Sequence, residues 1–173
     1  TAKTGLVTIT AGANDLRFKQ VLAACLDAAT AVACERGNIA VNRKLKALPR
    51  DLVRMLHTVT TTAPDARVVI TGYPLPFARK RTCPSVPVSA KIRVRANQIV
   101  TRLNKTISAA ATRAKVRYVD VEQEFAGHGL CSPRPWLVGV SGMRDNTVLH
   151  PTATGHLRGY LPAVARSGLT DRA

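Results

Sequence analysis

The chain has 173 residues, of which 26 are Lys or Arg, 10 are Asp or Glu and 46% are apolar, so that its net charge is +16. A chain of this length buries one substantial core, so we expect a single globular domain over residues 1–173 and exclude a disordered tail. No apolar run approaches the roughly 20 residues that span a bilayer, which argues against a membrane-spanning helix.

The first half of the chain has a strand, helix, strand pattern. Residues 5–10 are a short β-branched apolar run that ends at a glycine-containing turn, which predicts a buried strand, and Asp15 could cap the helix that follows. From 39 to about 61, apolar residues recur at steps of three and four and predict a helix, in which Pro49 is tolerable only near a first turn or at a kink. Residues 67–71 predict a second buried strand.

The second half continues the alternation. Prolines at four positions make 72–87 a loop, and an apolar stripe from 92 to 114 predicts a long helix. Residues 116–121 predict a third strand, a Gly- and Pro-bearing loop covers 125–149, and a final helix runs from about 152 to 166. The two helical stripes consist of Leu45, Leu48, Leu52, Leu56 and Val59, and of Ile92, Ala96, Ile99, Leu103, Ile107, Ala110 and Ala114.

Strands that alternate with long helices predict an α/β fold, with a parallel sheet covered by helices on both faces. In such sheets, ligands bind beyond the carboxyl ends of the strands. Three segments follow strands in this way: residues 11–15, residues 72–77 and the loop that ends at His150. We therefore expect these three segments to converge on one functional site.

Two of these segments carry candidate catalytic residues. Gly12 permits a tight turn after the first strand, and the side-chain amide of Asn14 could donate to a developing oxyanion, although an Asn-Asp pair at a helix start is more often only a cap. His150 lies at a loop-to-helix junction, where Pro151 suits the first helical turn, so its imidazole could act as a general base. His156 lies inside the helix, where a structural role is expected.

In chain order, these motifs resemble the SGNH (GDSL-type) hydrolases, and most of all the secreted lipases and esterases of actinobacteria. The resemblance is carried by residues 12–18, Tyr73-Pro74, residues 119–121, residues 125–131, Pro135-Trp136 and residues 149–156. It runs through nearly the whole chain. It implies a three-layer α/β/α sandwich with a flavodoxin-like parallel sheet, and a carboxylester hydrolase that acts on lipid or acyl esters without a cofactor or a metal.

By position in the family's motifs, Asn14 would donate to the oxyanion, His150 would activate a serine, and Gly12 would be the turn residue. The family commonly has an Asp three residues before this His, and Thr147 occupies that position here. Some members hold the His through a backbone carbonyl, which makes the Thr147 carbonyl a candidate to orient His150. Asp145 is the alternative, two residues earlier in the chain.

The resemblance also places the nucleophile outside this chain. The family's Gly-Asp-Ser block precedes the Asn block, and this sequence begins just before the Asn block. We therefore expect that the first strand and helix, with the serine, belong to a missing N-terminal segment, and that this chain alone is inactive. The only local substitute, Ser141 between Gly139 and Gly142, does not match the Gly-x-Ser-x-Gly elbow and follows no predicted strand.

The chain has four cysteines. The resemblance implies the pairs Cys25–Cys34 and Cys83–Cys131, and with them secretion into an oxidising compartment. The spacing of His128 and Cys131 would also suit zinc, but no second close pair of ligands accompanies them, so we expect no metal site.

No acidic residue falls between Asp65 and Asp120, although this stretch is rich in Lys and Arg. The basic residues in it are Arg67, Arg79, Lys80, Arg81, Lys91, Arg93, Arg95, Arg102, Lys105, Arg113, Lys115 and Arg117. The simplest interpretation is a solvated basic face, which would also favour an anionic lipid or cell-wall surface. An alternative function is a non-catalytic domain that binds a polyanion, although few aromatic residues and no recognised motif argue against specific nucleic-acid binding. A third alternative is a fragment with an exposed sheet edge and marginal stability.

Overall fold

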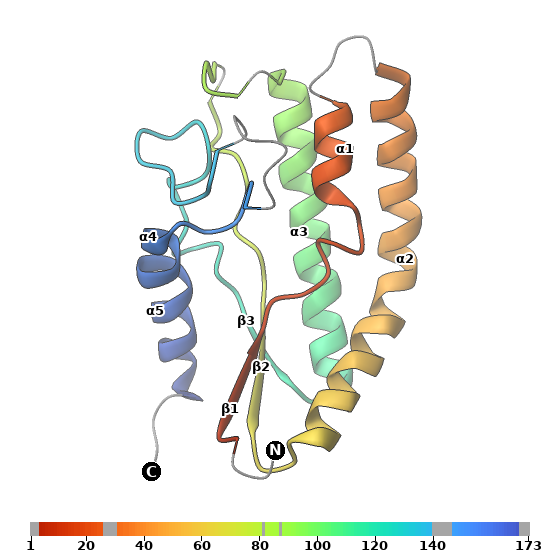
Figure 1. The fold of residues 1–173 in the computed structure, drawn as a ribbon, viewed down its shortest axis with the longest axis vertical. Helices are drawn as coiled ribbons and strands as arrows, with labels where there is room; N and C mark the ends of the chain where they lie inside the picture. Colours follow the sequence, from red (N-terminus) through yellow and green to blue (C-terminus); the bar gives the residue numbers. More distant parts are fainter. Residues whose placement is uncertain (1–3, 26–30, 81, 87, 140–146, 170–173) are drawn as a thin grey trace.

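The computed structural model describes residues 4–25, 31–80, 82–86, 88–139 and 147–169. Its centre is a parallel sheet with the strand order β1-β2-β3 (Figure 1). The strands are β1 (Leu6–Ile9), β2 (Arg67–Thr71) and β3 (Arg117–Val119). Ile9 pairs with Ile70, and Ile70 pairs with Tyr118, so the carboxyl ends of all three strands lie at the same edge of the sheet.

Helices cover the sheet from two sides. On one side lie α1 (Phe18–Ala24), α2 (Ala31–Thr62) and α3 (Ala90–Arg113), and on the other lies the C-terminal helical segment (Figure 1). That segment alternates between α and π turns through α4 (Ala153–Gly155), η3 (His156–Tyr160), α5 (Leu161–Val164) and η4 (Ala165–Leu169). The predicted α/β/α sandwich is therefore confirmed. Among the helices described, none is both long enough and apolar enough to cross a membrane.

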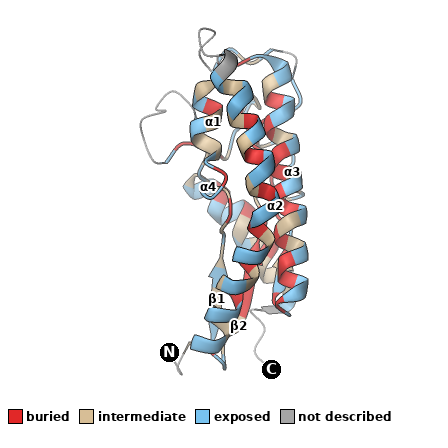
Figure 2. Cartoon of the chain, turned by 90° about the vertical axis from the view of Figure 1, so that its right-hand side faces the viewer, coloured by how far each residue is buried: buried red, intermediate tan, exposed pale blue. Residues whose placement is uncertain are grey.

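The core consists of two apolar clusters, one on each face of the sheet. Side chains of a strand point alternately to opposite faces, so Val68 and Ile70 pack toward α2 and α3 whereas Val69 packs toward the C-terminal side. The predicted stripes of α2 and α3 supply most of the first cluster, with Leu56 and Ile107 fully buried, whereas Ile92 and Ala96 at the start of α3 pack in the second cluster. Figure 2 shows these buried positions along the facing sides of the two helices, with exposed positions on their outer sides.

The strand predicted at residues 5–10 forms, but it is not buried as predicted. β1 alternates between exposed and half-buried residues, and Leu6 is 37% exposed. The reason is its position, because β1 is the end strand of the sheet in the part of the chain that the structure describes. An apolar, β-branched run shows that a strand forms, but it does not show how many neighbours the strand has.

Two predicted helix boundaries are also wrong. Asp15 does not cap α1, because the chain turns once more before the helix, and Arg17 is the N-cap, with a left-handed φ of 53° and no side-chain cap. The helix expected to begin at 39 begins at Ala31, and Pro49 lies in its interior. Figure 1 shows α2 bending along its length, as expected of a helix that contains an internal proline.

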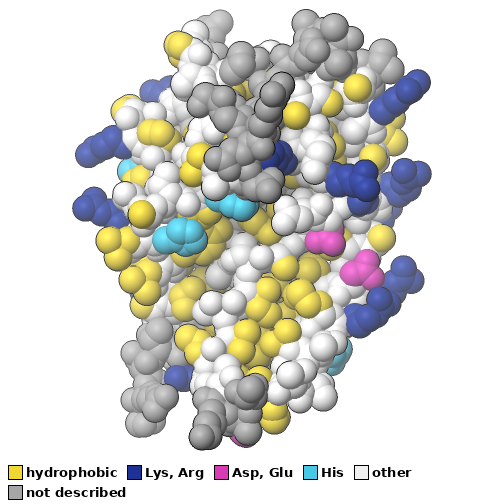
Figure 3. Space-filling view, viewed as in Figure 1, with side chains coloured by type: hydrophobic (Ala, Val, Ile, Leu, Met, Phe, Trp, Pro, Cys, Tyr) yellow, Lys and Arg dark blue, Asp and Glu magenta, His cyan; other side chains and the backbone are white. Residues whose placement is uncertain are grey.

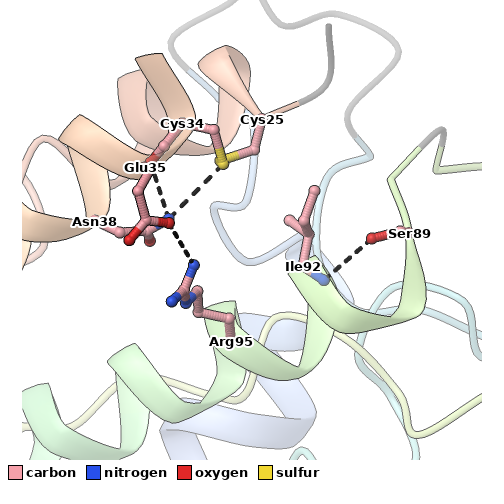
Figure 4. The surroundings of a disulfide bond; sticks show 7 residues. All are labelled: Cys25, Cys34, Glu35, Asn38, Ser89, Ile92 and Arg95. Carbon is pink, nitrogen blue, oxygen red and sulfur yellow. Dashed lines mark hydrogen bonds and ion pairs between the residues drawn. A yellow bond between two sulfur atoms is a disulfide. The ribbon is translucent and has the colours of Figure 1, made fainter. Parts of the chain in front are cut away.

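Both implied disulfides are present. Cys25–Cys34 joins the end of α1 to the first turns of α2 (Figure 4), and Cys83–Cys131 joins the loop after β2 to the loop after β3. Beside the first disulfide, the Asn38 amide donates to the Cys34 carbonyl at 2.9 Å, which satisfies a polar side chain that is only 7% exposed. Because Cys131 is oxidised, it cannot be a zinc thiolate, and the described residues contain no cluster of three or more metal-binding side chains.

Candidate active site

The ends of β1 and β2 are joined directly at the carboxyl edge of the sheet. The hydroxyls of Thr10 and Thr71 share a hydrogen bond of 2.6 Å. Shortly after these two threonines, the backbone N–H of Ala13 donates to the Tyr73 hydroxyl oxygen at 3.3 Å. The segment that carries Asn14 is therefore attached to the loop that follows β2.

The backbone around Asn14 is a tight turn. Gly12 has a φ of 121°, which L side chains rarely adopt, and a Cβ there would lie 3.1 Å from Leu103 Cδ1. The carbonyl of Asn14 accepts the Arg17 N–H at 2.9 Å, while the Asn14 residue itself is exposed. Gly12 thus brings the chain close to α3 and directs the following residues out to the edge.

His150 follows a second constrained turn. Its backbone N–H donates to the Thr147 carbonyl at 2.9 Å, and Leu149, the residue before it, has a left-handed φ of 65°. The Thr147 carbonyl therefore contacts the His150 main chain, and its role toward the imidazole remains a proposal. Asp145 and Ser141 lie outside the described residues. The His150 side chain is exposed, as expected of a group that must reach a substrate.

The loop at 136–138 holds the His150 segment on its other side. The N–H of Val138 donates to the His150 carbonyl at 2.9 Å, and the N–H of Leu149 donates to the Val138 carbonyl at 3.0 Å. The helix begins at Ala153, within one residue of the predicted start at about 152. Thr152 is the N-cap and its hydroxyl accepts the Gly155 N–H, so Pro151 precedes the helix and does not lie in its first turn. His150 is therefore flanked by backbone hydrogen bonds.

Aromatic rings pack against the loop at 136–138. Phe125 makes edge-to-face contacts with Trp136 at 5.6 Å and with Tyr160 at 5.5 Å between ring centroids. His128 stacks on Trp136 at 3.6 Å, and its Nδ1 lies 2.9 Å from the Arg134 carbonyl. His128 is thus a packing residue of the loop that supports His150.

Two asparagines of α3, which the sequence analysis did not single out, fix the loop after β2. Asn104 is 5% exposed, and it accepts the Tyr73 N–H at 2.9 Å and donates to the Tyr73 carbonyl at 2.8 Å. Asn97 bonds to both main-chain groups of Phe77 in the same way, at 3.1 and 2.8 Å. Their spacing of seven residues places both on one face of the helix, and that spacing was the only signal in the sequence.

One face of the molecule is apolar with basic margins. Figure 3 shows two histidine side chains side by side, next to a band of apolar side chains, with Lys and Arg at both margins of the molecule. Among the described residues of the predicted solvated basic face, Arg93 departs from the prediction, because it is only 5% exposed. Its guanidinium donates to the carbonyls of Val88 and Lys80 at 2.6 and 2.8 Å, so it ties the preceding loop to α3.

The sequence model of the GDSL-like Lipase/Acylhydrolase family matches residues 1–158. The chain belongs to this family, as its motifs indicated. It is 32% identical to Lipase 1 of Streptomyces coelicolor and 34% identical to a lipase of Streptomyces rimosus, in each case over 161 residues, which are 93% of this chain. The chain spans 59% of the length of each of these relatives.

Two crystal structures have the same fold. The extracellular lipase of Streptomyces rimosus matches with a TM-score of 0.86 at 32% identity, and phospholipase A1 of Streptomyces albidoflavus NA297 matches with a TM-score of 0.87 at 31% identity. Each comparison covers 96% of this chain and 70% of the other. These matches agree with the sandwich described above.

Proposed function

We propose that this chain is the larger part of a carboxylester hydrolase of the lipase or esterase type. The observation that carries the proposal is the match of the GDSL-like family model to residues 1–158, and it is supported by the position of Asn14 after β1 and of His150 at the end of the loop after β3. The relatives named lipase and phospholipase A1 support an ester or lipid substrate.

In the proposed mechanism, a serine hydroxyl attacks the ester carbonyl and His150 takes its proton. The carbonyl oxygen becomes an oxyanion, and the side-chain amide of Asn14 donates a hydrogen bond to it. The alcohol then leaves with the proton from His150, and water hydrolyses the acyl-enzyme by the same steps. The Thr147 carbonyl orients His150, with Asp145 as the alternative, and Gly12 forms the turn that presents Asn14.

The serine is supplied by a segment outside these 173 residues. Several described serines have other roles: Ser89 caps α3, Ser85 contacts Cys83, and Ser167 donates to the Val164 carbonyl. In the part of the chain that the structure describes, β1 is the end strand of the sheet, so a strand of a further segment could pair with it. Leu6, Leu157 and Leu161, at 37%, 64% and 55% exposure, are apolar side chains that such a segment would bury.

The test is ester hydrolysis by the full-length gene product and by its His150→Ala variant. Wild-type protein should hydrolyse a p-nitrophenyl ester, and the variant should retain at most about a thousandth of the rate, because the serine loses its base. His57→Ala is the matched control, since His57 is an exposed histidine on α2. Equal turnover by wild type and the His150 variant would refute the assignment.

The proposed location is outside the cell, supported by the two disulfides and by the relative described as extracellular. The net charge of +16 also supports contact with an anionic lipid or cell-wall surface. It is also the observation that favours the second candidate function, a non-catalytic polyanion-binding domain. Salt-resistant retention on heparin, with no labelling of the full-length protein by a fluorophosphonate probe, would favour that second function.

A further inference from the structure

We propose that Tyr73 is a positioning residue for Asn14: its hydroxyl holds the backbone N–H of Ala13 and thereby fixes where the Asn14 amide points. The proposal rests on the esterase function above, in which Asn14 donates to the oxyanion. Tyr73 itself need not touch the substrate.

The first step is the contact itself. Ala13 immediately precedes Asn14, and its N–H donates to the Tyr73 hydroxyl oxygen at 3.3 Å across a sequence separation of 60 residues. Because the peptide plane is rigid, a fixed N–H at Ala13 restricts the position of the next residue to rotations about two backbone bonds. The carbonyl of Ala13 is also engaged, since it accepts the Phe18 N–H at 3.4 Å.

The second step is that Tyr73 is itself fixed. Both of its main-chain groups bond to the buried amide of Asn104. The same Nδ2 of Asn104 also donates to Glu122 Oε1 at 2.8 Å, so the amide is held between the loop and the chain after β3. Tyr73 therefore joins the rigid helix α3 at its main chain to the Asn14 turn at its hydroxyl.

A further hydrogen bond holds the preceding residue. The Tyr160 hydroxyl donates to the Gly72 carbonyl at 3.3 Å, from the C-terminal helical segment. A Cβ at position 72 would lie 2.5 Å from the Tyr118 hydroxyl and 3.2 Å from Asn104 Oδ1, so no larger residue fits there without displacement. Residues 72 and 73 are thus clamped between α3 and the helical segment that follows His150.

Protonation of Tyr73 keeps the contact constant over ordinary pH. Burial is the main cause that raises the pKa of Tyr73 above 10.0, and the negative charge of Asp15 adds to it, while the hydrogen bond from Ala13 opposes them. The phenol therefore stays neutral where an esterase is assayed. The hydroxyl accepts the Ala13 N–H and keeps its own proton for a second hydrogen bond.

The test is Tyr73→Phe in the full-length protein, which removes one oxygen and keeps the ring. A misplacement of about 1 Å costs about 100-fold in rate, so partial loosening of Asn14 should lower kcat by about 10-fold and leave KM within about 2-fold. Tyr118→Phe is the matched control, because it removes the same single phenol oxygen from a tyrosine of β3 that makes none of the hydrogen bonds described above. Its kcat should change by less than about 2-fold.

Amide hydrogen exchange at Ala13, followed by NMR, separates this proposal from the esterase function. The Ala13 N–H should exchange about 10-fold faster in Tyr73→Phe and at the wild-type rate in Tyr118→Phe, whether or not the protein hydrolyses esters. Unchanged exchange at Ala13, or a Tyr73→Phe kcat equal to that of wild type, would overturn the positioning role. If the wild type is inactive on esters, the proposed function fails, and Asn14 then has no oxyanion for Tyr73 to serve.

Discussion

Asn104 bonds to both main-chain groups of Tyr73, accepting its N–H at 2.9 Å and donating to its carbonyl at 2.8 Å. A side-chain amide has the same donor and acceptor as a peptide group, so Asn104 acts toward the loop as a neighbouring strand would. Asn97 repeats the arrangement at Phe77, two helical turns earlier. The loop that leaves β2 is therefore held against α3 by these two side chains.

Replacement of Asn104 by Ala should destabilise the protein by about 2–4 kcal/mol. The substitution leaves the N–H and the carbonyl of Tyr73 without their partners in a site where Asn104 is only 5% exposed. Urea unfolding measures the change. Asn42→Ala is the control, because Asn42 makes a single exposed hydrogen bond to Arg102, and it should cost less than about 0.5 kcal/mol. Equal effects of the two variants would show that the pairing with Tyr73 contributes little.

Asn14→Ala should lower kcat of the full-length esterase by about 100- to 1,000-fold, the usual effect of removing one oxyanion donor. KM should change little, because the hydrogen bond strengthens only as charge develops on the oxygen. Steady-state kinetics on a p-nitrophenyl ester measures both values. Asp15→Ala is the matched control, since Asp15 is exposed and does not cap α1. A loss of activity only in the Asp15 variant would refute the assignment of Asn14.

The two disulfides should contribute unequally to stability. Cys83–Cys131 closes a loop with a sequence separation of 48, which predicts about 4 kcal/mol from the entropy of the unfolded chain. Cys25–Cys34, with a separation of 9, predicts about 3 kcal/mol. Paired Cys→Ser variants, compared by urea unfolding, should show the larger loss for the first pair. The reverse order would mean that local packing outweighs loop entropy.

Stability should fall in alkaline solution. Burial is the main cause that raises the pKa of Tyr73, Tyr118 and Tyr160 above 10.0. Above about pH 10, the unfolded chain has therefore lost phenolic protons that the folded chain still holds, so the free energy of unfolding decreases as pH rises. Urea midpoints at about pH 9 and about pH 11 measure the decrease, which should be smaller in Tyr160→Phe. Identical decreases in the variant and the wild type would exclude Tyr160 as a contributor.

Lys115→Gly should stabilise the chain by about 1 kcal/mol. Lys115 follows the C-terminal end of α3 with a left-handed φ of 55°, its N–H donates to the Thr112 carbonyl, and the next N–H donates to the Ala111 carbonyl. This is the Schellman arrangement, in which glycine is the usual residue.

The matched control is Lys105→Gly, at an exposed position inside α3, which should instead destabilise by about 1 kcal/mol. Thermal unfolding of both variants gives the signs directly. Destabilisation by both variants would show that the Lys115 side chain contributes more than its backbone strain costs.

The sequence by itself determined the elements whose pattern is periodic. β2 at Arg67–Thr71 and the stripe of α3 were predicted correctly, because buried strands and amphipathic helices require apolar residues at fixed spacings. The motifs also determined the family, and through it both disulfides. Gly12, Asn14 and His150 came from the same motifs, and their catalytic roles stay predictions.

Only the tertiary structure decided how these parts are held together. The exposure of β1 depends on its place in the sheet. The helix α2 begins at Ala31, before the part of the sequence in which apolar residues recur at steps of three and four. The bonds from Asn104 to Tyr73 and from Ala13 to Tyr73 join residues 31 and 60 positions apart. Polar contacts of this kind depend on which two segments of the chain come together in the folded protein. The periodicity of neither segment predicts that contact.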